Sequence, residues 1–435
     1  MVPHLTTALN GPLLSLEKSM LDAMPKIEHW FRSQWLEYAA PFYASVDLRN
    51  SGFKLAPVDT NLFPGGFNNL NPEFLHLCVQ AAMVAVEKVC PDAHSLLIIT
   101  ENHTRNTYYL RNVIELANIL KQAGMNVRIG SIAPEITVPT KFDIDGKTLL
   151  LEPVVRIGNR IKLPQSSING VTLEEFDSCA ILLNNDLSGG IPEILTNLEQ
   201  DLIPPLYAGW STRRKSQHFA AYNRVASEFA QLIGIDEWLL NPYFDTCGEI
   251  DFNARTGEEC LATKVEQLLE KIKLKYAEYG VTQEPFVIVK ADAGTYGMGI
   301  MTVKSPDDVR DLNRKTRNKM SVVKEGLQVS EVIIQEGVYT FESIDDAVAE
   351  PVVYMMDHFV IGGFYRVHTG RGVDENLNAP GSSFIPLAFA KPCTLPDCAG
   401  APDAPPNRFY AYGVVARLAL LAAAIELQEQ NPLNQ

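Results

Sequence analysis

Apolar residues recur along this chain with two periods, which together predict a protein built from both helices and strands. Through Ile27, Trp30, Phe31 and Trp35 they stand three and four positions apart, the spacing of one helical face, and this predicts a helix over 10–40. Similar patterns predict helices over 72–89, 108–122, 215–232, 258–279, 306–319 and 408–430. Short β-branched runs predict strands at 95–100, 126–130, 179–184, 287–290, 300–303 and 332–338, with hairpins at 148–163 and 351–368.

The order of these elements indicates a parallel sheet in the first half of the chain. Strand 95–100, helix 108–122 and strand 126–130 form a βαβ unit, whose strands run parallel. Strand 179–184 ends in the polar turn 185–192, at the kind of carboxyl end where open α/β sheets bind ligands. Residues 56–70, rich in Gly, Pro and Asn, are expected to form a loop.

Composition and charge narrow the range of partners. The net charge is −15, which argues against binding nucleic acid or an anionic membrane surface. The longest apolar stretch, 413–427, is too short to span a bilayer, and no secretory signal is visible, so we expect a cytoplasmic protein. The seven cysteines, an odd number, suit free thiols, and Cys393 and Cys398 are interpreted as loop cysteines without a metal or redox role.

A lysine followed by a glycine-rich loop is the strongest chemical signal. Lys290 ends a β-branched run, and the loop 293–299 after it contains Gly294, Gly297 and Gly299. Glycine frees the backbone to approach phosphates and to offer N–H groups to them, while the lysine adds a cation. This pattern predicts a nucleotide site.

Two further polar segments are candidates for binding small anions or zwitterions. Residues 49–69 contain two cations, one carboxylate and several amides, which suit an amino acid, although amide-rich loops are often self-capped turns. The residues in question are Arg49, Lys54, Asp59, Asn61, Asn68 and Asn69. Arg213, Arg214 and Lys215 stand at the start of a predicted helix, where they face either an anion, such as phosphate or a substrate carboxylate, or solvent.

The succession of motifs from 287 to 384 resembles the nucleotide half of the ATP-grasp ligases, and its pattern is similar to glutathione synthetase. Lysine strand, glycine loop, helix, strand 332–338 and hairpin are followed by Arg366 and the turn 376–381. The resemblance implies that Lys290 neutralises phosphates under a loop containing Gly294, Tyr296, Gly297 and Gly299. It also implies a base and ribose pocket at Gln335, Glu336 and Val338, in which Glu336 accepts from the ribose. Arg366 would act on the transferred phosphoryl group, and Asn376 would hold a phosphate or magnesium oxygen.

With the 59–69 segment included, the chain resembles the ATP-grasp-related bacterial glutamate–cysteine ligases. That resemblance implies ATP- and Mg²⁺-dependent joining of the γ-carboxylate of L-glutamate to the amine of L-cysteine through an acyl phosphate. It implies an α/β fold, α+β in part, with a helical segment and α/β substrate domain over 1–205, an ATP-grasp-like lid over 206–335 and a core with a C-terminal helix over 336–435.

Some of the implied features stay open at this stage. The magnesium-bearing strand of the family has no evident counterpart, so Glu375 and Asn378 are candidate ligands beside Asp357, Glu350 and the Glu429–Asn431 segment. Another ATP-grasp amide ligase, glutathione synthetase included, would keep the same nucleotide residues. A nucleotide-binding protein without catalysis is the third interpretation. Nothing in the sequence indicates the oligomeric state.

Overall fold

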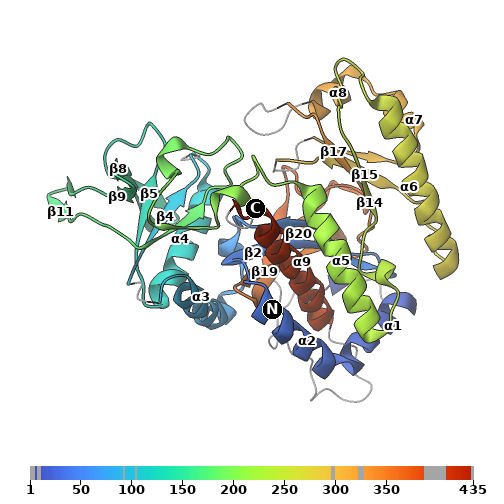
Figure 1. The fold of residues 1–435 in the computed structure, drawn as a ribbon, viewed down its shortest axis with the longest axis horizontal. Coiled ribbons are helices and arrows are strands. Elements are labelled where there is room, and N and C mark those ends of the chain that lie inside the picture. Colours follow the sequence, from blue (N-terminus) through green and yellow to red (C-terminus); the bar gives the residue numbers. More distant parts are fainter. Residues whose placement is uncertain are drawn as a thin grey trace.

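The computed structural model describes residues 5–6, 11–91, 94–102, 105–294, 299–321, 328–386 and 408–432, and these form three larger sheets (Figure 1). A mainly parallel sheet lies on the left of the view, an antiparallel sheet at the centre, and a four-stranded sheet at the upper right. The predicted α/β fold, α+β in part, is confirmed by this arrangement.

The mainly parallel sheet has the strand order β13-β12-β4-β5-β7-β6. Its parallel pairs join β4 (Ser95–Thr100) to β5 (Asn126–Ser131) on one side and to β12 (Ala180–Asn184) on the other. The predicted βαβ unit is therefore present, with α4 (Thr107–Gln122) as its crossover and α3 (Leu75–Val89) packed against α4. The remaining strands are β13 (Asp201–Ile203), β6 (Thr140–Ile144) and β7 (Lys147–Pro153).

The predicted hairpin at 148–163 is wrong, because its residues belong to two hairpins. β7 turns back on β6, which precedes it, through the Asp145–Gly146 turn. The second hairpin joins β8 (Val155–Ile157) to β9 (Arg160–Lys162), and a third joins β10 (Ser166–Ile168) to β11 (Val171–Leu173). The left-handed Asp145 and Gly146 place the first turn before the range in which the apolar pattern indicated a hairpin.

The central antiparallel sheet joins the two ends of the chain. β2 (Tyr43–Asn50) pairs with β3 (Leu55–Asn61) and with β19 (Ala347–Met356), and β19 pairs with β20 (Phe359–His368). The sheet also contains β1 (Leu5–Thr6), β18 (Ser343–Ile344) and β21 (Ser383–Pro386). The expected loop at 56–70 therefore begins as a strand, in which Pro57 is tolerated at an irregularity of the β2–β3 ladder. The sheet therefore combines strands from the domain expected over 1–205 with strands from the one expected over 336–435.

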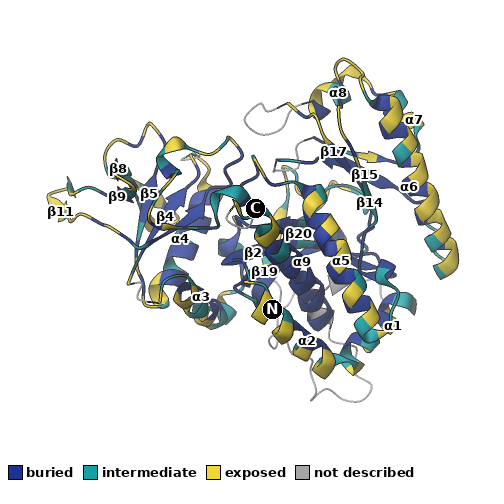
Figure 2. Ribbon diagram, in the orientation of Figure 1, coloured by how far each residue is buried: buried dark blue, intermediate teal, exposed yellow. Residues whose placement is uncertain are grey.

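The four-stranded sheet carries the lysine strand. Its antiparallel order is β14-β17-β15-β16, formed by Phe244–Cys247, Val332–Glu336, Val287–Ala291 and Ile300–Val303. Helix α6 (Glu258–Tyr279) packs on this sheet, and the side of the helix that faces away from the sheet is exposed (Figure 2). The helix predicted over 306–319 is two short ones, α7 (Asp307–Arg310) and α8 (Arg314–Met320), separated by 311–313.

Helix α9 (Arg408–Gln430) lies at the centre, beside α5 (Lys215–Ile233) and against β2 and β3 (Figures 1 and 2). It is the one described helix long and apolar enough to cross a membrane, and 89% of its apolar window is buried inside the protein. The helix predicted over 10–40 is divided into α1 (Gly11–Asp22) and α2 (Met24–Glu37), because Pro25 begins a second helix.

Candidate active site

Two cavities meet between the sheets and share part of their walls. The first lies between the four-stranded sheet and the central sheet, and contains Lys290, Gly294 and Gln335 in its wall. The second lies between the central sheet and the carboxyl ends of the parallel strands. Asp47, Asp59 and Asn378 line both cavities.

One face of the four-stranded sheet forms the first cavity. Gln335 pairs with Ile288, and Ile300 pairs with Lys290, so alternation places all four side chains on the same face. Lys290 is buried, and its Nζ donates to the Val58 carbonyl at 2.8 Å. Burial lowers the pKa of Lys290, while Asp59 and Asp47 oppose that shift.

The first and last glycines of the glycine loop, Gly294 and Gly299, adopt a backbone conformation that favours glycine. Gly294 has a φ of 94° and Gly299 a φ of 61°, both in the left-handed region. Gly294 also lines the first cavity. Tyr296 and Gly297, which were predicted to bind nucleotide, lie outside the described residues.

Glu336, which lines the first cavity, forms a buried ion pair with Lys54. The Glu336 carboxylate accepts from Lys54 Nζ at 2.8 Å, from Trp238 Nε1 at 3.0 Å and from the Tyr243 backbone N–H at 2.9 Å. These three donors occupy the carboxylate predicted to accept from the ribose. Lys54 lines neither cavity, and burial lowers its pKa to about 8 against the opposing charge of Glu336.

The wall between the cavities carries two carboxylates with different environments. Asp47 and Asp59 face each other across the β2–β3 ladder. Burial raises the pKa of Asp47, and Arg366 opposes that shift only in part. Burial would also raise the pKa of Asp59, but Lys215, Lys290 and Arg213 together hold it below its usual value.

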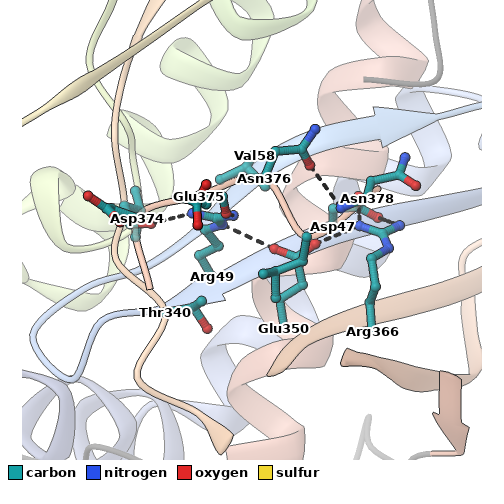
Figure 3. Close-up of polar contacts among 12 residues, drawn as sticks. Asp47, Arg49, Val58, Thr340, Glu350, Arg366, Asp374, Glu375, Asn376 and Asn378 are labelled. Atoms are coloured by element: carbon teal, nitrogen blue, oxygen red, sulfur yellow. Dashed lines mark hydrogen bonds and ion pairs between the residues drawn. The ribbon is translucent and has the colours of Figure 1, made fainter. Parts of the chain in front are cut away.

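Two arginines and Glu350 brace this wall (Figure 3). Arg366 Nη1 contacts Asp47 Oδ2 at 2.7 Å and Glu350 Oε1 at 2.6 Å. Arg49 Nε contacts Glu350 Oε2 at 3.1 Å, and Arg49 lines the first cavity. Arg366, predicted to act on the phosphoryl group, lines only the second cavity, where it holds Asp47.

The turn after β20 contributes amides. Asn376 lines the first cavity and accepts from the Asn378 backbone N–H at 2.9 Å. Glu375, a candidate metal ligand, lines neither cavity, and its carboxylate pairs with Arg371 at 2.9 Å. Among the described residues, no three His, Cys, Asp or Glu side chains are grouped to hold a metal ion by themselves.

The second cavity combines predicted and unpredicted residues. Asn61, Asn68 and Asn69 line it as the sequence suggested, from β3 and the short 3₁₀ turn Phe67–Asn69. Opposite them lie side chains from the carboxyl ends of β4 and β12 and from the start of α4: Glu101, Asn184, Asp186, Asn106, Tyr108 and Tyr109. The polar turn after strand 179–184 was the signal in the sequence for this side.

Of the three basic residues 213–215 considered as anion ligands, only Lys215 lines a cavity. It lines the first cavity, its Nζ donates to the Gly294 carbonyl at 2.5 Å, and burial lowers its pKa to about 8. Arg213 instead binds Glu426 in the core, with Nε at 2.8 Å from Oε1. Arg214 pairs near the surface with Glu331, 3.4 Å away, and lines neither cavity.

The comparisons with known proteins agree with one another. Residues 17–427 match the family model "GshA: Glutamate-cysteine ligase". A crystal structure of "Putative gamma-glutamylcysteine synthetase" from Methylobacillus flagellatus KT is 77% identical over 99% of this chain and all of that one, with a TM-score of 0.90.

More distant structures contribute little. A glutathione synthetase-like effector from Globodera pallida (8% identity, 86% and 84% of the two chains) and D-alanyl-alanine synthetase A from Vibrio cholerae (11%, 74% and 80%) have TM-scores of 0.37 and 0.33, too low to carry an argument. No curated protein sequence matches the chain.

Proposed function

The chain belongs to the glutamate–cysteine ligase family, and is thus an ATP-dependent carboxylate–amine ligase, for which we propose a division of labour between the two cavities. The first cavity binds ATP, and the second binds the amino acids. The γ-carboxylate of L-glutamate meets the γ-phosphate at the shared wall. The observation that carries this proposal is that Asp47, Asp59 and Asn378 line both cavities.

The ATP site consists of two cations, a glycine and a polar strand end. Lys290 and Lys215 would neutralise phosphates, with Gly294 bringing the backbone close. Gln335 and the backbone near Val338 would contact the base, with Asn376 turned to the phosphates. Glu336 would act indirectly, by fixing the strand through Lys54, Trp238 and Tyr243.

The oxygen donors at the shared wall suit an Mg²⁺ ion that is bound together with ATP, and not one that the protein holds by itself. It prefers oxygen ligands and usually takes only one or two protein carboxylates together with substrate phosphates. Asp59 and Asp47 would supply carboxylate oxygens there, and Asn378 an amide oxygen. The ion would neutralise phosphate charge as it develops. Glu375 lines neither cavity.

Catalysis needs no side-chain nucleophile in this scheme. The γ-carboxylate of glutamate attacks the γ-phosphate, giving an acyl phosphate and ADP. The amine of cysteine then attacks the acyl carbon, phosphate leaves, and the amine gives up a proton. Lys215 and Lys290 stabilise charge, while Arg366 positions Asp47 and thereby the wall on which the reactants meet.

Phosphate release tests this function directly. With ATP and Mg²⁺, release should require glutamate and cysteine together, and mass spectrometry should identify γ-glutamylcysteine. Release with γ-glutamylcysteine plus glycine, but not with glutamate plus cysteine, would instead identify a glutathione synthetase. Release with no amino-acid pair would point to a nucleotide-binding protein without ligase activity.

Its partners are small molecules, as the family implies, and we place the reaction in the cytoplasm. The support for that location is that all five cysteines in the described residues are free thiols. Cys393 and Cys398 lie outside the described residues.

A further inference from the structure

The second cavity lies at the place where successive strands of the parallel sheet are added on opposite sides of β4. From β4 the chain passes through α4 to β5 on one side, whereas β12 joins the other side of β4. Between two such neighbours the connections leave in opposite directions, and a crevice opens beyond their carboxyl ends. Glu101 follows β4 and Asp186 follows β12, and both line the second cavity.

Hydrogen bonds hold this crevice in a fixed shape. Tyr109 on α4 donates its hydroxyl to the Asn184 carbonyl at 2.7 Å and accepts from the Glu101 backbone N–H at 2.9 Å. Glu101 Oε1 accepts from the Asp186 backbone N–H at 2.9 Å. The ends of three elements are thereby tied together, so the two carboxylates are preorganised before any ligand arrives.

The same crevice offers donors for an anion. Helix α4 begins there, with Asn106 as its cap and Tyr108 in the cavity wall, and a helix start favours a carboxylate. Trp210 lines the cavity and donates its backbone N–H to the Asp186 carbonyl at 2.9 Å. Its buried indole Nε1 has no hydrogen-bond partner in the part of the chain that the structure describes.

Two carboxylates beside an unpaired indole N–H and the start of a helix match an α-amino acid head group, and we propose that this crevice binds the α-ammonium and α-carboxylate of glutamate. The proposal rests on the function proposed above. Glu101 and Asp186 would hold the ammonium, while the start of α4 and Trp210 would receive the carboxylate.

The chemistry of the reaction indicates that this crevice binds glutamate and not cysteine. The cysteine amine must lose a proton before it attacks, and a pair of carboxylates would keep it protonated. The glutamate ammonium takes no part in the chemistry and can stay bound. With its head group held in the crevice, glutamate extends its side chain towards Asp47 and Asp59, so the γ-carboxylate and not the α-carboxylate reaches ATP.

Asp186→Asn and Glu101→Gln test this assignment with little risk to folding. Each variant removes one negative charge but keeps the oxygen that accepts from Ser188 or Asp186. Asp201→Asn is the matched control, because Asp201 pairs with Ala180 at the opposite end of the same sheet. The substrates are glutamate and glutarate, which has both carboxylates but no ammonium, each with cysteine, ATP and Mg²⁺.

Each charge-removing variant should raise the KM for glutamate roughly ten- to a hundredfold, with the KM values for ATP and cysteine nearly unchanged. The preference for glutamate over glutarate should fall by a similar factor, because glutarate never used the lost charge. Asp201→Asn should match the wild type. An unchanged preference in both variants, or a rise in the cysteine KM instead, overturns the assignment. Failure of the proposed function would look different, since the wild type itself would then form no γ-glutamylcysteine.

Discussion

At the scale of single residues, the site depends on cations held in low-dielectric surroundings. Lys290 Nζ donates to the Val58 carbonyl at 2.8 Å, lies 5.5 Å from the centre of the Phe219 ring and lines the first cavity, where its charge can meet an entering anion. Lys290→Met should weaken ATP binding roughly ten- to a hundredfold and leave the melting temperature unchanged or higher, because a buried charge is removed.

Titration calorimetry with ATP and a thermal melt measure both effects. Lys304→Met, on a half-exposed lysine that pairs with Asp374, should leave ATP affinity unchanged. Equal affinities in the wild type and in Lys290→Met would remove Lys290 from the nucleotide site.

Lys215 should make ATP binding depend on pH. Burial lowers its pKa to about 8, so in the free protein it loses its proton as the pH rises from 7 to 9. ATP favours the protonated form, so affinity should fall by about tenfold over that interval, and binding near pH 8 should take up protons. Lys215→Arg keeps its charge throughout and should flatten the curve. A wild-type curve as flat as that of the variant would show that Lys215 does not meet the phosphates.

Arg366 should influence turnover more than nucleotide binding. It lines the second cavity, and its guanidinium contacts Asp47 through two nitrogens and Glu350 through one of them, a forked geometry that the single ammonium of lysine cannot reproduce. Arg366→Lys should lower kcat about tenfold or more and leave the KM for ATP within about twofold, as expected for an interaction that matters in the transition state. Steady-state kinetics decide the point, and a normal kcat would limit Arg366 to a structural role.

At the scale of elements, α9 is fixed to α5 by a buried cluster. Glu426 binds Arg213 at 2.8 Å and His218 at 3.1 Å. Burial would raise the pKa of Glu426, but Arg213 and His218 lower it to about 2. Because the folded-state pKa lies below the usual 4.5, the stabilisation is complete above pH 4.5 and is lost as the pH falls towards 2.

Glu426→Gln should therefore lower the free energy of unfolding by about 3–5 kcal/mol at pH 7, since it leaves Arg213 buried without its partner. The difference from the wild type should shrink below pH 4. Denaturant unfolding measures it, with Glu429→Gln as the control, because Glu429 forms an exposed pair with Arg224. Equal losses in the two variants would contradict the buried-pair interpretation.

Elements with a strong local signal could be predicted from the sequence, and those specified by distant partners could not. Strands β15 and β16 are β-branched runs around a glycine loop, so their own residues identify them. Strand β2 was not predicted, because its charged Asp47 and Arg49 interrupt the apolar pattern and are paired only by the distant Arg366 and Glu350. In the basic cluster 213–215 only Lys215 reaches the cavity, and the sequence cannot tell which of three adjacent side chains does so.

At the scale of the whole molecule, both cavities depend on residues from the two ends of the chain. Arg49 and Glu350 meet although 301 positions separate them, and α9, near the last described residue, covers β2 and β3. Contacts so distant in sequence close slowly during folding. The parallel sheet, by contrast, is made from residues 95–203 alone.

During synthesis, the ribosome therefore completes the parallel sheet long before the active site can exist. The β2–β3 hairpin leaves the exit tunnel early, and its apolar side stays uncovered until α9 has been synthesised. A ribosome stalled well beyond residue 203 but before residue 408 would release a polypeptide with an ordered parallel sheet, a β2–β3 hairpin that α9 does not cover, and a strong tendency to recruit chaperones.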